Sequence, residues 1–156
     1  MKYRLINSNY SSNYIENILA ESGIDGEILL NPTKDYLQSP EYLDNIDKAF
    51  KCLMNYIEDD TKFALITDSD VDGFSSGAIL YSYIKLLNPY KQIDYFCHDG
   101  KQHGLEDMME NINNASYSIV FCPDSATNDG DYVEQIAPTK VICLDHHIKE
   151  EDTIVP

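Results

Sequence analysis

Basic residues are scarce in this chain, and their scarcity limits what its surface can bind. The 156 residues include 11 Lys and Arg against 27 Asp and Glu, which gives a net charge of −16. A surface this acidic repels polyanions wherever cations do not compensate it. We therefore expect this portion alone to hold nucleic acid weakly if at all.

Long apolar runs and paired cysteine motifs are also lacking. After Lys2 and Arg4 the chain turns to Asn and Ser, so we expect neither a secretory signal nor a membrane span, and a cytoplasmic location. The cysteines lack CxxC spacing, and three lie in apolar runs, so core packing is favoured over zinc ligation or disulfides for Cys52, Cys97, Cys122 and Cys143.

The apolar pattern that is present predicts an α/β fold. Helical spacing marks residues 11–22 and 40–58, and a turn-rich connector covers 26–39. Four short apolar strands follow at 63–66, 93–97, 117–122 and 140–144, separated by helical stretches near 75–87, 105–111 and 131–136. This alternation predicts a parallel, Rossmann-like sheet of four to five strands wrapped by helices. We expect residues 1–60 to form a helical lead-in packed on the sheet and 61–156 to form a metal-binding core, together a single compact domain.

Acidic residues and histidines follow every predicted strand. Ligands bind at the carboxyl ends of strands in such sheets, so these residues are the candidates for chemistry. They occur in the segments Asp68-Ser69-Asp70-Val71-Asp72-Gly73, His98 to Gly104, Pro123-Asp124-Ser125 and Asp145-His146-His147. Asp68, Asp70 and Asp72 alternate, so an extended backbone would place their carboxylates on one side, where they would repel without cations. Mixed carboxylate and imidazole ligands favour Mn²⁺, Fe or Zn over Ca²⁺, and two ions suit phosphoryl hydrolysis.

Simpler interpretations exist for each piece. A calcium loop starting at Asp68 requires Glu at its twelfth position, where this chain has Ile79. Asp124 alone could be a helix cap, and one of His146 and His147 a solvated loop residue. His98 and His103 could touch substrate or simply end a strand.

Gly73 would let the backbone turn sharply into a helix near Ser75, whose N-terminal amides could hold a phosphate.

Taken together, the motifs resemble the DHH phosphoesterase superfamily in its RecJ-like form, the single-stranded-DNA-specific exonucleases. The segment from Asp68 to Gly73 is similar to the first motif, residues 123–129 (PDSATND) to the second, and Asp145-His146-His147 to the tripeptide that names the superfamily. Residues 98–105 and the lead-in from Leu19 to Ile57 also look RecJ-like. Ala126 stands where such sequences usually have glycine.

The resemblance implies a Mn²⁺-dependent, two-metal phosphodiesterase that degrades single-stranded DNA from 5′ to 3′, with Mg²⁺ as the other candidate ion. It implies Asp70, Asp72, Asp124 and His146 as metal ligands, with Asp124 bridging and Asp68 as ligand or neighbour. Asp145 would orient His146, and His147 and His103 would act in catalysis. Substrate would contact His98, Lys101, Gly104, Ser125 and Asn128.

Two parts of the family pattern are not reached before Pro156. They are a fourth motif with another aspartate ligand and a C-terminal domain that closes over the substrate, so the resemblance implies a sheet incomplete at the C-terminus and an incomplete metal site. The preferred explanation is a fragment of a longer exonuclease, because residues 153–156 read like the start of a strand. The others are a short protein completed by a partner chain and an inactive relative.

Other functions stay open at this point. A DHH hydrolase of small nucleotides or pyrophosphate is the first alternative, although such relatives usually place a histidine several residues before the DxD pair, where this chain has Ile66 or a neighbour. A metal-binding interaction module without turnover is the second. Acidic mimicry of DNA is disfavoured because the acids are scattered among helices and loops.

Overall fold

The computed structural model describes residues 13–31, 33–100 and 103–150. The predicted strand at residues 153–156 lies outside this range. Contacts divide the chain into two units, Met1–Asp44 and Asn45–Pro156. The expected packing of residues 1–60 on the sheet, within one compact domain, stays a prediction.

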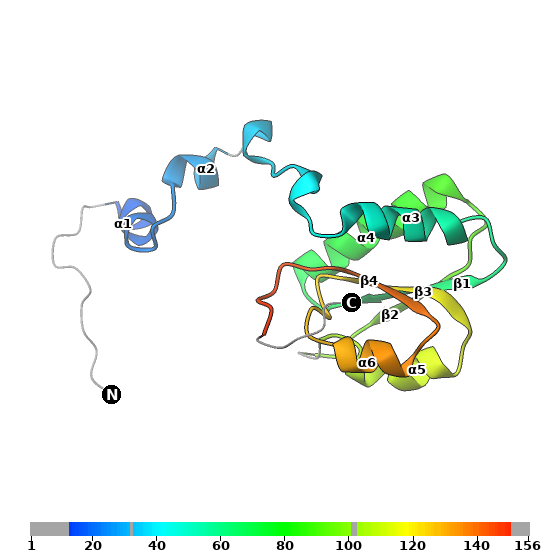
Figure 1. The fold of residues 1–156 in the computed structure, drawn as a ribbon. Coiled ribbons are helices and arrows are strands. Elements are labelled where there is room, and N and C mark those ends of the chain that lie inside the picture. Colours follow the sequence, from blue (N-terminus) through cyan, green and yellow to red (C-terminus); the bar gives the residue numbers. More distant parts are fainter. Residues whose placement is uncertain (1–12, 32, 101–102, 151–156) are drawn as a thin grey trace, which may run out of the picture. The chain divides into compact units, whose positions relative to one another are not determined.

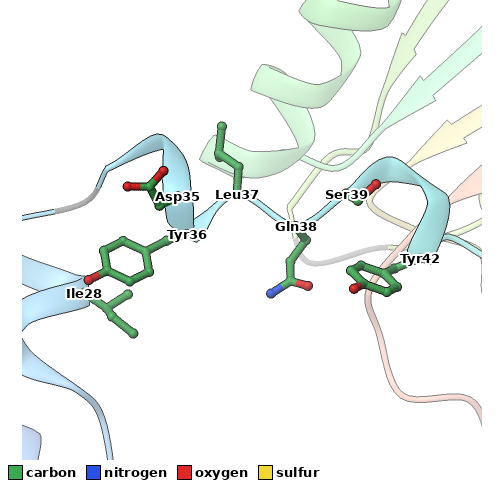
Figure 2. A pocket seen from close by; sticks show the side chains of 7 residues that line it. All are labelled: Ile28, Asp35, Tyr36, Leu37, Gln38, Ser39 and Tyr42. Atoms are coloured by element: carbon green, nitrogen blue, oxygen red, sulfur yellow. The ribbon is translucent and has the colours of Figure 1, made fainter.

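The first unit is a series of short helical elements. Helix α1 (Tyr14–Glu21) begins at Asn13, whose side chain accepts hydrogen bonds from the amides of Ile15 and Glu16. It is followed by α2 (Gly26–Leu30), where the sequence predicted only a connector, and by the 3₁₀ turns η1 (Lys34–Tyr36) and η2 (Pro40–Tyr42). An open hollow of about 500 Å³ in this unit is shown in Figure 2; its lining consists of Ile28, Asp35, Tyr36, Leu37, Gln38, Ser39 and Tyr42.

The second unit is a parallel sheet between two helical layers. Its strands are β1 (Lys62–Thr67), β2 (Ile93–Cys97), β3 (Tyr117–Pro123) and β4 (Lys140–Leu144), in the order β2-β1-β3-β4. All three strand pairs are parallel. The predicted α/β class and the predicted strands are therefore confirmed within the described residues.

Alternate residues of the central strands build two separate cores. Phe63, Leu65 and Phe121 pack on one face with Leu53 of α3 (Ile46–Tyr56) and Ile84 of α4 (Val71–Leu87). Ala64, Ile66, Val120 and Cys122 point to the other face. That face is covered by residues of η3 (Glu106–Met108), α5 (Met109–Asn113) and the segment around α6 (Gly130–Gln135). Figure 1 shows α3 and α4 on one side of the sheet and α5 and α6 on the other.

The cysteines are only partly core residues. None of the four forms a disulfide, and their exposure differs: Cys122 is buried, Cys52 and Cys143 are half-buried, and Cys97 is exposed. The prediction of core packing is wrong for Cys97. Strand β2 lies at the edge of the sheet, so its last residue lacks the cover that a central strand receives.

None of the described helices is both long enough and apolar enough to cross a membrane.

Candidate metal centre

Every predicted motif lies at the carboxyl edge of the sheet. Asp68 follows β1, His98 follows β2, Asp124 follows β3 and Asp145 follows β4. Because all four strands run in the same direction, these ends share one edge. The parallel topology thus gathers residues separated by more than seventy positions in the chain.

Two groups of potential ligands share one aspartate. Asp70, Asp72 and Asp124 form one group, and Asp124, His146 and His147 form the other, with ligand atoms within 4.8 Å of one another in each group. His146 Nε2 lies 3.1 Å from Asp124 Oδ1. Asp124 is therefore the residue that the two groups have in common, and the bridging role that the family resemblance implies for it stays a prediction.

The environment of Asp124 suits a cation. Burial raises the pKa of its carboxyl, and the negative charges of Asp72 and Asp70 raise it further. Its backbone adopts φ +68°, a left-handed conformation that non-glycine residues rarely hold. A divalent ion between these carboxylates would relieve their repulsion, and the oxygen and imidazole donors fit Mn²⁺ or a similar metal. Residues Asp70, Asp72, Asp124 and His146 could hold it.

Asp68 does not join this group, contrary to the expectation that three alternating carboxylates share one side. Helix α4 begins earlier than predicted, at Val71, with Asp70 as its N-cap accepting a hydrogen bond of 3.0 Å from the Gly73 amide. The backbone is therefore helical at Asp72. Asp68, only 1% exposed, instead pairs with the ring of His103.

Gly73 serves close packing and not the sharp turn that the sequence suggested. A β-carbon on Gly73 would lie 2.8 Å from the carbonyl oxygen of Asp68. The glycine therefore lets the first turn of α4 approach the backbone that follows β1. This contact holds the first turn of α4 against the segment that contains Asp68.

Asp145 orients His147, whereas the sequence analysis assigned it to His146. Its Oδ1 lies 2.6 Å from His147 Nδ1, and its Oδ2 accepts a hydrogen bond of 2.6 Å from the Thr127 hydroxyl. Burial raises the pKa of Asp145, but the hydrogen bonds from Thr127 and His147 outweigh it and lower the pKa to about 2. The same pairing is the main reason that the pKa of His147 is raised.

The predicted substrate-binding residues differ in how accessible they are to a substrate. The side chain of His98 is fully buried and Ser125 is 1% exposed, so neither lies where a substrate could touch it. Gly104 is buried, with φ +81° and its α-carbon against the Asp129 carboxylate. Asn128 is exposed, but it binds the backbone of Ile148 and Glu150. Lys101 lies outside the described residues.

Sequence reasoning missed two supporting residues within the second motif. Thr127 holds Asp145, and Asp129 accepts a 2.5 Å hydrogen bond from the Leu105 amide, which fastens the loop that carries His103. Both residues belong to segment 123–129 (PDSATND), so the similarity of this segment to the family's second motif was the sequence feature that could have indicated them. Ala126 adopts φ +73°, a left-handed conformation that favours glycine.

A sequence model described as the DHH family, N-terminal domain, matches residues 62–156, more than half of the chain. The chain belongs to the DHH family. The matched range holds the whole sheet and every residue of the two ligand groups.

Two curated proteins are similar in sequence to this DHH-family chain. YorK of Bacillus subtilis (strain 168), named provisionally as an SPbeta prophage-derived single-strand DNA-specific exonuclease, is 34% identical over 151 residues. The yorK protein of Bacillus phage SPbeta, with a corresponding name, matches to the same extent. The alignment covers 94% of this chain and 26% of each relative, so the chain spans about a quarter of their length.

Proposed function

We propose that this chain is the metal-binding part of a RecJ-like phosphodiesterase that degrades single-stranded DNA. The observation that carries the proposal is the position of Asp124 in both ligand groups, because a shared carboxylate could contact two neighbouring ions of the kind that a two-metal phosphoesterase uses. The names of the two relatives support single-stranded DNA as the substrate. A 5′ to 3′ direction and Mn²⁺ as the preferred ion, with Mg²⁺ as the alternative, belong to the same proposal.

In this mechanism the acidic cluster, which consists of Asp70, Asp72 and Asp124, holds the metal together with His146, and His147 serves the phosphate. Asp70, Asp72, Asp124 and His146 would bind two divalent ions. When bound, such ions polarise a phosphoryl oxygen and make water a better nucleophile near neutral pH. The two bound ions would also neutralise part of the −16 charge that otherwise repels DNA.

His147 is the residue best placed to touch the phosphate. Its Nδ1 is held by Asp145, and half of its side chain is exposed beside Asp124. A ring fixed through Nδ1 keeps Nε2 available for the substrate or for proton transfer. Asp145 stabilises the protonated ring, since the pairing raises the pKa of His147.

The net charge of −16 also affects how strongly this chain can bind DNA. Without clustered basic residues, this chain would bind the DNA backbone poorly. A C-terminal domain or a partner chain would supply that contact, as the family resemblance implies.

Digestion of labelled DNA by this chain, joined to the domain or partner chain that binds the DNA backbone, tests the proposal. We expect Mn²⁺-dependent release of mononucleotides from single strands and not from duplexes, lost in Asp124→Asn and Asp72→Asn and retained in Glu134→Gln. Glu134 is an exposed acid of α6 outside both ligand groups, so it controls for the loss of one negative charge. Cleavage of cyclic dinucleotides or pyrophosphate with no attack on long strands would instead identify a small-substrate DHH hydrolase. Metal binding without turnover of any of these substrates would identify an interaction module.

A further inference from the structure

Two pairs of carboxylate and imidazole groups repeat the same arrangement at the sheet edge. Asp145 holds Nδ1 of His147, and Asp68 holds Nδ1 of His103. In both pairs the aspartate side chain is 2% exposed, while the histidine side chains are 50% and 57% exposed. In each of the two pairs, a buried carboxylate thus fixes one ring nitrogen of an accessible histidine.

The two rings converge from opposite edges of the sheet. His103 follows edge strand β2 and His147 follows edge strand β4. Their ring centroids are 6.1 Å apart, and His147 is a member of the second ligand group. The ring of His103 therefore lies next to the metal centre although it contributes no ligand atom to either group.

The surroundings of Asp68 fix its position. Gly73 packs against its backbone, and Ser69 Oγ donates a hydrogen bond to the carbonyl of Gly100 in the loop that carries His103. The Leu105 amide, beyond the same loop, is bound to Asp129. Both members of the Asp68–His103 pair therefore sit on backbone that is tied down on either side.

Asp68 also faces a second, buried imidazole. Its Oδ1 has no hydrogen-bond partner among the described residues, and neither ring nitrogen of His98 has one. His98 Nε2 lies 4.0 Å from that oxygen, with its side chain fully buried. Asp68 thus points one oxygen at an exposed histidine and the other at a buried one, and it belongs to neither ligand group.

We propose that Asp68 is a positioning residue for His103 and not a metal ligand, and that the pair directs His103 Nε2 toward the phosphate of a substrate held at the acidic cluster. With the Nδ1 proton donated to Asp68, Nε2 carries the lone pair and accepts a hydrogen bond from water beside the phosphate. The role at the phosphate rests on the proposed function, whereas the Asp68–His103 pairing does not.

The pairing can be tested without any nuclease activity. The chain has four histidines, so long-range ¹H–¹⁵N spectra of the ¹⁵N-labelled protein, assigned with single His→Gln variants, can identify the tautomer of each ring. For neutral His103 we expect a protonated Nδ1 and a bare Nε2, and in Asp68→Ala a shift toward protonated Nε2. A protonated Nε2 on His103 in the wild-type protein would overturn the proposal without any variant.

Metal titration separates positioning from ligation. We expect Asp68→Asn to bind Mn²⁺ within about twofold of wild type, while Asp70→Asn loses at least about tenfold, a difference of about 1.4 kcal/mol. Urea unfolding of both variants would confirm that they fold. Equal losses in the two variants would make Asp68 a ligand and refute the proposal.

The role at the phosphate has its own kinetic test on single-stranded DNA. We expect Asp68→Asn and His103→Gln each to lower kcat with little change in KM, and the double variant to be no slower than His103→Gln. If the loss of kcat in the double variant equalled the product of the two single-variant losses, the two residues would act separately, which would contradict the proposal. Absence of nuclease activity even when the chain is joined to the domain or partner that binds the DNA backbone, together with the expected tautomer, would refute the proposed function and leave the pairing intact.

Discussion

A β-carbon added to Gly77 of α4 would lie 2.4 Å from Cγ2 of Thr67 at the end of β1. Real β-carbons do not approach this closely, so the helix rests on the strand only because residue 77 has no side chain. The first motif depends on this contact, since α4 begins within it.

Gly77→Ala should therefore destabilise the protein even though alanine favours helices. Overpacking costs about 1–3 kcal/mol, while the gain in helix propensity is about 1 kcal/mol. We expect a lower urea midpoint for Gly77→Ala than for Ser75→Ala, an exposed position of the same helix. Equal midpoints would mean that α4 does not pack this closely on β1.

Lys91 should make a large contribution to stability because its ammonium group is buried. Its Nζ donates to Asp59 Oδ1 at 2.5 Å, to Tyr56 O at 2.6 Å and to Asp59 O at 3.0 Å. Lys91→Met should lower the free energy of unfolding by about 2 kcal/mol, since hydrogen bonds to charged groups are worth about 1.5–3 kcal/mol. Lys62→Met, which removes a half-exposed ion pair of 3.7 Å with Asp94, should change it by less than about 1 kcal/mol. Similar losses in the two variants would contradict the burial of Lys91.

Thr127 should keep the pKa of Asp145 low. The hydroxyl and the amide of Thr127 both donate to Asp145, whose pKa is about 2. Thr127→Val removes the hydroxyl and should raise that pKa toward 3.8, whereas Thr127→Ser should preserve it. Carbon-13 NMR titration of the Asp145 carboxyl in metal-free protein measures the change. An unchanged pKa in Thr127→Val would assign the depression to His147 and the backbone.

Tyr117 should make the protein sensitive to alkali. Burial and the neighbouring Asp94 raise its pKa from 10.0 to about 12, and its hydroxyl donates to Asp94 Oδ2 at 2.8 Å. Below pH 10 the phenol is protonated in both folded and unfolded chains, so its contribution is fully present there. Between about pH 10 and 12 the unfolded chain loses the proton first, and stability falls.

Tyr117→Phe isolates this effect from the other tyrosines. We expect the wild-type unfolding midpoint to fall more steeply than that of Tyr117→Phe between about pH 10 and 12. Parallel curves would show that Tyr117 ionises normally in the folded protein.

The fold and the edge that carries the site could be predicted because both follow from local patterns. Short apolar strands alternating with helical spacing indicated a parallel sheet, and such a sheet necessarily brings Asp124 and His146 to one edge. The family motifs pointed to Asp124, which the structure places in both ligand groups. The agreement was best where a residue directly follows a strand.

The separation of Asp68 from Asp70 and Asp72 could not be predicted in this way. Three alternating aspartates are all good N-caps, so the sequence did not indicate at which one α4 begins. The pairing of Asp68 with His103 joins residues 35 positions apart and depends on how two loops fold against each other. Likewise, Asp145 could have held either neighbouring histidine until the backbone of the loop was known.

The most direct test of the account is Mn²⁺ titration calorimetry of the wild-type chain beside Asp124→Asn, Asp72→Asn, His146→Gln and the control Glu134→Gln. Because Asp124 belongs to both ligand groups, we predict that Asp124→Asn abolishes Mn²⁺ binding, that Asp72→Asn and His146→Gln each weaken only part of it, and that Glu134→Gln binds like wild type. Wild-type affinity and stoichiometry in Asp124→Asn would contradict a shared centre built on this residue.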